Sequence, residues 1–332
     1  MSEERRGILL GAAAYACWGL FPLYFPLLEP ASAVEIVAHR VVWTLVFVVV
    51  LLLVRRRWSW VRSIVVDRRR LLILAVASVV LSVNWGVYIW AVNSDRVVEA
   101  ALGYFINPLV TVLLGVVLLG ERLRRAQWVA VGLATVAVLV LTAAYARPPV
   151  IALVLALSFG TYGLMKKKVD MPAVESLAVE TSLMFVPATV LLVVLQVQGT
   201  ATFGHAAASV TALLVGVGAV TAIPLLLFAG AAARTPLSTM GLLQYITPIL
   251  QFMIGVFVVH ESMPASRWVG FGLVWAALVL LSVDSLRAGR AQRAGSGQAV
   301  GSGSSAAADS SSTASASSET TTDSRRVGAP NE

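Results

Sequence analysis

The chain is organised around residues 102–141, which read LGYFINPLVTVLLGVVLLGERLRRAQWVAVGLATVAVLVL. Moved forward by 140 positions, this stretch aligns without a gap with residues 242–281, LLQYITPILQFMIGVFVVHESMPASRWVGFGLVWAALVLL. Five distinctive residues coincide at this offset, namely Pro108 with Pro248, Gly115 with Gly255, Glu121 with Glu261, Trp128 with Trp268 and Gly132 with Gly272. Apolar composition alone does not produce such coincidences, and self-similarity at a fixed offset indicates a duplicated architecture.

The composition is typical of a protein embedded in a membrane. The chain has 332 residues, of which 58% are hydrophobic and only 13% charged, whereas a soluble domain has about a quarter charged. Apolar runs of roughly 20 residues recur, each long enough to cross a hydrocarbon core of about 30 Å. The runs lack the alternation of barrel strands, so we expect an all-α membrane protein.

The apolar runs predict ten transmembrane helices, at about 7–28, 34–54, 71–92, 97–119, 126–145, 149–164, 174–195, 208–230, 237–259 and 267–283. We therefore expect a first five-helix repeat at 1–145 and a second at 146–286. Residues 287–332 are rich in Ser, Ala and Gly and are expected to be a disordered cytoplasmic tail. An odd number of helices per repeat gives the two repeats opposite orientations. Inverted repeats are typical of secondary transporters, whose substrate site lies near the midplane.

Charge in the connections predicts the orientation. The ends that include both termini carry most of the Lys and Arg, whereas the opposite ends hold only Arg96, Arg147 and Arg267. The positive-inside rule therefore places both termini in the cytoplasm. The net charge of +8 follows this topology pattern and does not indicate nucleic-acid binding.

Two polar stripes lie at the centre of the duplication. Tyr104, Asn107 and Thr111 share one helix face, and Gln244, Thr247 and Gln251 occupy the equivalent positions 140 residues later. Polar side chains in membrane helices face the protein interior or a wet cavity. Pro108 and Pro248 lie in these stripes and are expected to kink the helices. Lining of a substrate pathway and simple polar packing between helices both remain open.

Further pathway candidates come from aromatic and amide residues. The first helix carries Tyr15 and Trp18, and the sixth carries the matching pair Phe159 and Tyr162. These rings either wall a cavity or pack as an aromatic core. The third helix adds a dense group of hydrogen-bonding side chains, Asn84, Trp85, Trp90 and Asn93.

Ionisable residues inside apolar helices are functional candidates because their burial is costly. Glu35, His39 and Arg40 lie near the outer end of the second helix, and Glu175 and Glu180 stand 140 positions after Glu35 and Arg40. Glu180 is the candidate proton-coupling carboxylate; the alternative is an interfacial carboxylate paired with a cytoplasmic Lys or Arg. His39 and Arg40 either contact an anionic group or extend to the outer interface.

Other acids have simpler explanations. Glu99 opens the fourth helix, and Glu121 and Glu261 precede the fifth and tenth helices. At these places an acid suits the positive end of the helix dipole. The sequence shows no catalytic motif, so we expect neither an enzyme nor a catalytic residue, and neither a cofactor nor a metal.

The chain resembles the EamA branch of the drug/metabolite transporter superfamily, through PLVTVLLGVVLLGER at 108–122. More specific stretches resemble its RarD-type permeases: EIVAHRVVW at 35–43, NWGVYIWAVNSDRVVEAALGYFINPL at 84–109 and GLLQYITPILQF at 241–252. The resemblance covers about residues 7–285. It implies a central cavity lined by the first four helices of each repeat, with the fifth and tenth helices as scaffold, and export or exchange of small organic solutes.

These observations together predict a secondary active transporter of the bacterial inner (plasma) membrane. Its expected partners are the lipid bilayer and a small organic solute, a drug or a metabolite, with no nucleic acid. A proton or counter-substrate and a homodimer are left open. The alternative is a non-transporting membrane sensor or assembly subunit.

Overall fold

The structure, a computed structural model, describes residues 2–284 except positions 57, 120–122, 146–147, 170 and 236, together with residue 287. The predicted tail at 287–332 therefore lies almost entirely outside the described residues. Residues up to Asp284 form one compact unit. All regular secondary structure in the described part of the chain is helical, so the all-α prediction is confirmed there.

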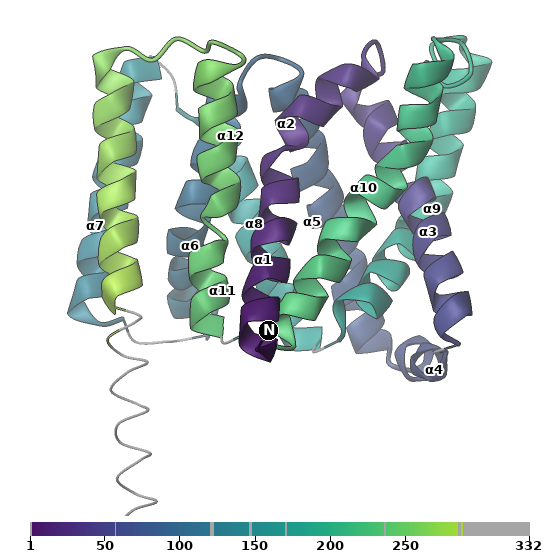
Figure 1. The fold of residues 1–332 in the computed structure, drawn as a ribbon, viewed down its shortest axis with the longest axis horizontal. Helices are drawn as coiled ribbons and strands as arrows, with labels where there is room; N and C mark the ends of the chain where they lie inside the picture. The colour runs from purple at the N-terminus through teal and green to yellow at the C-terminus, as the bar shows by residue number, and fades with distance from the viewer. Residues whose placement is uncertain are drawn as a thin grey trace, which may run out of the picture. The chain divides into compact units, whose positions relative to one another are not determined.

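The helices follow the predicted apolar runs (Figure 1). The first half contains α1 (Glu3–Gly19), α2 (Phe21–Tyr24), the short 3-10 helix η1 (Phe25–Leu28), α3 (Ala33–Arg55), α4 (Ser59–Val66), α5 (Arg68–Val92), α6 (Val97–Leu119) and α7 (Arg125–Tyr145). The second half contains α8 (Val150–Val169), α9 (Ala173–Val197), α10 (Ala208–Ala232), α11 (Leu237–Leu243) and α12 (Ile246–Phe257), followed by a last helix, Ala265–Asp284.

Seven helices of the described chain are long and apolar enough to span a membrane, and α1 with its continuation makes an eighth if the bent pair is one span. Two further apolar helices, Val150–Lys166 and Ile246–Phe257, are shorter. The fold is thus multi-pass. That all ten predicted segments cross the bilayer stays a prediction.

Two of the predicted helices are broken where proline interrupts them. The first turns by 42° between α1 and the segment Phe21–Leu28, where Pro22 and Pro26 stand at the starts of α2 and η1. The ninth breaks at residues 244–245, between α11 and α12. Pro248 lies in the first turn of α12, and a proline ring clashes with the carbonyl four residues earlier, here that of Gln244. Pro108, by contrast, lies inside the continuous helix α6.

An additional helix, α4, forms in the Arg-rich connection, for which the sequence predicted no helix. Its Ile64 is buried with Leu74, Val169 and Val179. The Asp67 side chain then accepts a hydrogen bond from the Arg70 backbone N–H and caps α5. In Figure 1, α4 and the N-terminal end of α1 lie at one end of the bundle, and α2 lies at the other.

The two halves of the chain interlock. Among the helices from α1 to α12, the most extensive packing joins a helix before residue 146 with one after it: α6 and α5 with α8, α3 with α9 and α10, α1 with α10 and α12, and α6 with α12. Glycine, which has no side chain, permits some of these close approaches between helices. A Cβ atom added to Gly103 of α6 would lie 2.8 Å from the Ala152 carbonyl oxygen of α8. The interface between the halves is therefore the centre of the molecule.

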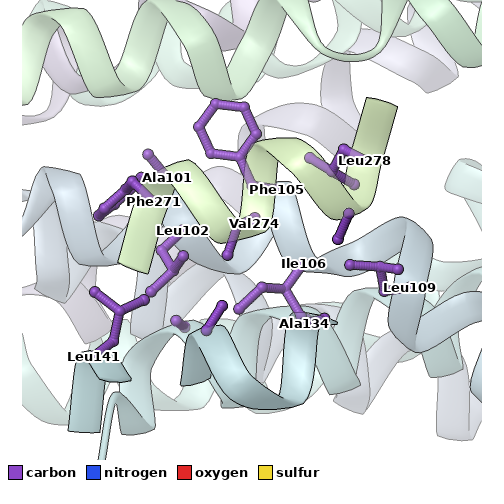
Figure 2. Close-up of a cluster of buried hydrophobic side chains, with 14 of the residues drawn as sticks. Ala101, Leu102, Phe105, Ile106, Leu109, Ala134, Leu141, Phe271, Val274 and Leu278 are labelled. Atoms are coloured by element: carbon purple, nitrogen blue, oxygen red, sulfur yellow. The ribbon is translucent and has the colours of Figure 1, made fainter. Parts of the chain in front are cut away.

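An apolar core ties α7 and the last helix to α6. Figure 2 shows Phe105, Leu102 and Ile106 of α6 packed among side chains of those two helices, including Leu141 and Phe271. All five side chains are buried. The buried side chains of this cluster are apolar and contribute packing to the fold.

Candidate functional site

Arg40 is the most unusual side chain of the interior. It lies two turns into α3, is only 4% exposed, and its guanidinium carbon is 3.9 Å from the centroid of the Trp85 ring. Phe21 and Phe25 lie farther off, with ring centroids at 5.4 and 5.9 Å. Such an arrangement is a cation–π contact. The side chain of Arg40 is therefore enclosed by other side chains of the protein.

A hydrogen-bonded group joins α12 to the aromatic residues near Arg40. Gln251 is 2% exposed; its side-chain amide donates to the Tyr88 hydroxyl at 2.9 Å and to the Trp18 carbonyl at 3.3 Å. One turn earlier, Thr247 donates to the Tyr15 carbonyl at 2.7 Å. Side chains of α12 thus donate to backbone carbonyls near the end of α1. The usual helical donor to the Trp18 carbonyl would be residue 22, which is a proline and has no N–H.

Asn84 connects the same region to α8. Its amide nitrogen donates to the Leu155 carbonyl at 3.2 Å and to the Ser158 hydroxyl at 2.9 Å, and its oxygen faces the Tyr104 hydroxyl at 3.4 Å. The rings of Tyr88 and Tyr104 are in edge contact, with centroids 5.6 Å apart. The structure therefore brings together candidate residues that lie far apart in the sequence.

The aromatic candidates form two groups. Tyr15 and Trp18 pack against each other and against Phe228, with ring centroids 5.5–6.0 Å apart. Phe159 contacts both Tyr104 and Tyr162, at 6.0 and 6.2 Å. Each group contains the aromatic pair of one matched sequence pattern, together with Phe228 of α10 in the first and Tyr104 of α6 in the second.

Several predicted pathway residues do not join this group. Trp90 is 46% exposed and contacts Arg96, whose guanidinium carbon is 5.2 Å from its ring centroid. Thr111 is exposed and donates to the Asn107 carbonyl of its own helix. Asn93 caps the end of α5, and Gln244 lies in the break before α12. The side-chain oxygen of Asn107 is buried without a hydrogen-bond partner among the described residues.

Glu180 is surrounded by donors. Its carboxylate lies 2.9 Å from the Lys166 ammonium, accepts a hydrogen bond from the Tyr162 hydroxyl at 3.0 Å, and lies 2.8 Å from the Ser176 hydroxyl. Glu180 is 2% exposed. The sequence shows no neighbour of opposite charge beside it, but α8 supplies Lys166 across the helix interface. Its role in proton coupling stays a prediction.

Glu35 and His39 face away from Arg40. The Glu35 carboxylate accepts from the backbone N–H groups of Thr202 and Phe203 at 2.7 and 3.1 Å, and His39 Nε2 lies 4.0 Å from it. With Phe203 they line a cavity of about 280 Å³ beside α9. Five positions of α helix separate Glu35 from Arg40 by about 140° around the axis. The two are therefore on different sides of α3.

The expectation for Glu261 is corrected by the structure. Its carboxylate does not cap the last helix; it accepts from the Val98 backbone N–H at 2.7 Å, in the first turn of α6. The chain after α12 turns back through His260, which has a positive φ of 58°, so the carboxylate reaches the other half. Burial raises the pKa of Glu261 to about 7. Glu121, its partner in the duplication, lies outside the described residues.

Sequence reasoning missed Tyr88, Phe21 and Phe25. Tyr88 follows Asn84 by four positions, which places both on one face of α5; this spacing is a signal that could have identified it. Phe21 and Phe25 carry no such signal, because their position beside Arg40 depends on the bend after α1.

The comparisons with known proteins agree with this architecture. The EamA-like transporter family matches twice, over residues 5–143 and 148–283. A RarD protein of Streptomyces exfoliatus is 57% identical over 292 residues, covering 88% of this chain and 93% of that protein. A RarD protein of Escherichia coli K12 is 41% identical over 288 residues, covering 87% and 97%. One solved crystal structure shares the fold, with a TM-score of 0.53 at 16% identity, and covers 84% of this chain and 98% of that chain. The chain belongs to the EamA-like transporter family, as a membrane permease similar to RarD proteins.

Proposed function

We propose that this protein is a secondary active transporter that moves a small organic solute by alternating access between two inverted five-helix repeats. The observation that supports this most directly is the composition of the region around Arg40. Helices α3 and α5 of the first half supply Arg40, Trp85 and Tyr88, and α12 of the second half supplies Gln251. A site shared between repeats changes its access when the repeats move relative to one another.

The depth of this region fits the proposal. Arg40 stands seven residues after the start of α3, which is about 10 Å along the helix axis. A hydrocarbon core is about 30 Å thick. In the proposed topology, Arg40 then lies inside the membrane, between the outer surface and the midplane.

The orientation is proposed from the charge pattern of the connections. At one end Arg234 pairs with Glu3 at 2.8 Å, and Arg124 pairs with Asp284 at 2.8 Å. In the proposed topology this end and both termini are cytoplasmic. The end that holds Glu261 and the start of α6 then faces outward.

The test is reconstitution of the purified full chain into liposomes. Metabolites and drugs are first screened by thermal shift, because a solute that prefers the folded state raises the unfolding temperature. Solutes that raise it are then tested for gradient-driven uptake and for counterflow exchange. We expect at least one to be transported, and we expect Gln251→Ala to reduce the turnover of a folded protein.

A matched control is Thr135→Ala, since the Thr135 hydroxyl is exposed on α7 and bonds only to its own helix. This control should leave transport unchanged. If the screened solutes bind but none crosses the membrane in either assay, the protein is a sensor or assembly subunit instead.

A further inference from the structure

Arg40 lacks the partners that a buried charge ordinarily has. Its Nε atom is buried without a hydrogen-bond partner among the described residues. None of the ion pairs found in that part of the chain includes Arg40. An isolated charge removed from water costs several kcal/mol. Within a membrane such a cation is kept for a function more often than for stability.

The nearby acids are engaged elsewhere. Glu35 lies on the other side of α3 and accepts two backbone N–H groups. Glu180 is paired with Lys166. The polar groups that share the region with Arg40 are neutral: Tyr88 and Gln251 bond to each other. The region therefore holds one positive charge with no described negative charge to balance it.

The Nε–H group of Arg40 has no hydrogen-bond partner among the described residues, although Trp85 contacts the guanidinium. A guanidinium is planar and carries five N–H donors in its plane, and Trp85 covers one face at 3.9 Å. A stacked guanidinium still presents its edge to an acceptor. That edge matches the two oxygens of a carboxylate or a phosphate, which bind it in a bidentate manner.

The remaining surroundings are aromatic. Phe21, Phe25 and Tyr88 are each at most 6% exposed, and they offer ring faces and edges around the guanidinium. Rings of this kind bind an apolar or aromatic body by burial and ring contacts. The region thus combines one cationic edge with an apolar wall.

We infer that Arg40 binds the acidic group of the transported solute, and that this solute is a small organic oxyanion with an apolar or aromatic body. The inference rests on the proposed function, because it assigns the substrate class of that same site. Trp85 holds the guanidinium in place, and the anion supplies the charge that the protein leaves unbalanced.

The experiment measures thermal unfolding of the purified chain in an uncharged detergent, with matched probes. Benzoate and phenyl phosphate are the anionic probes, and benzamide is the neutral analogue. We expect the anions to raise the unfolding temperature in a concentration-dependent manner and benzamide to leave it unchanged. Arg40→Lys should weaken binding about tenfold or more, because it removes the bidentate edge, and Arg40→Met should abolish the response.

Three results would overturn the inference: equal stabilisation by benzamide, an unchanged response to benzoate in Arg40→Met, or a shift produced by sodium chloride alone. A shift that only added phosphatidylglycerol produces would assign the charge to a lipid head group and would also overturn it. Lys166→Met serves as the control, since this variant also loses a cation of the interior, here a partly buried one, but should retain the response to benzoate.

Liposome assays separate this inference from the proposed function. If benzoate binds through Arg40 but nothing crosses the membrane, the binding site is supported and transport is excluded. If a neutral solute crosses equally fast in the wild type and in Arg40→Met, transport is supported and the substrate class is wrong.

Discussion

Arg40 and Glu180 occupy equivalent positions of the duplication, 140 residues apart, and the structure treats them in opposite ways. Both are buried, at 4% and 2% exposure. Glu180 has an ammonium partner and two neighbouring hydroxyls. Arg40 has aromatic rings around it and no ion pair among the described residues. The second half therefore neutralises its buried charge with a side chain of its own, whereas the described residues of the first half do not neutralise Arg40.

The neighbouring helices explain the difference. The pattern Trp18-Gly19-Leu20 of α1 and its continuation matches Tyr162-Gly163-Leu164 of α8, and in that alignment Lys166 takes the place of Pro22. The second half thus places a cation opposite its buried acid. The first half bends its helix at the same place and turns Phe21 toward Arg40. The duplication kept the geometry and changed the chemistry, so the two positions have separate roles.

The largest expected effect comes from breaking the ion pair between Glu180 and Lys166. Glu180→Leu leaves the partly buried Lys166 without its counter-charge, which should lower the free energy of unfolding by about 2–4 kcal/mol. The lower part of the usual range applies because the Lys166 side chain is 22% exposed. Denaturant unfolding in detergent measures the loss, and the double variant Glu180→Leu with Lys166→Met should recover much of it.

The milder change Glu180→Gln tests the coupling role of this carboxylate. It retains the hydrogen bond from Tyr162 and removes the titratable group. If Glu180 carries the coupled proton, pH-driven transport should be lost while counterflow exchange persists. Survival of pH-driven transport would leave Glu180 with a structural role only.

Substitution of Arg40, which has no ion pair among the described residues, should change the stability less. Arg40→Met removes a charge with no described counter-charge and retains contact with the rings, so the free energy of unfolding should stay within about 1 kcal/mol of the wild type, or rise. The same unfolding assay applies. A loss above about 2 kcal/mol would mean that Arg40 stabilises the fold. Arg40 and Glu180 would then both be structural and would differ only in the kind of partner they have.

The smallest effect concerns Glu261, a half-buried acid whose partner is a backbone N–H of the other half. Its cavity also holds Asp95, Arg96, Glu99, His260 and Arg267. Burial raises the pKa of Glu261 from 4.5 to about 7. Between these two pH values, Glu261 is protonated in the folded state and ionised in the unfolded state. Stability should therefore fall as the pH rises from about 5 to about 8.

Glu261→Gln tests that pH dependence, since glutamine imitates the protonated acid and still accepts from Val98. As the pH rises, the unfolding temperature of the wild type should fall relative to that of Glu261→Gln. A pH-independent difference would show that Glu261 does not titrate in this range.

Much of this protein follows from its sequence. The apolar runs placed the helices, because an α-helix that crosses lipid must satisfy its own backbone. The 140-residue offset identified the duplication and the polar positions Tyr104 and Gln251, and the dense group of hydrogen-bonding side chains on the third helix identified Asn84. The helix breaks were harder to place, since proline marks them only to within one turn: Pro248 follows its break, whereas Pro108 lies inside a continuous helix.

Only the tertiary structure decided which polar residues meet. Periodicity places a residue on a helix face and says nothing about the helix opposite. Glu180 therefore had no visible partner until α8 brought Lys166 to it, and Glu261 proved to cap α6 of the other half instead of the helix that follows it. Likewise, the sequence shows Arg40 as a charge in an apolar helix. Packing decides that it is enclosed by rings and left without a counter-charge in the described chain, because helices from both halves converge there.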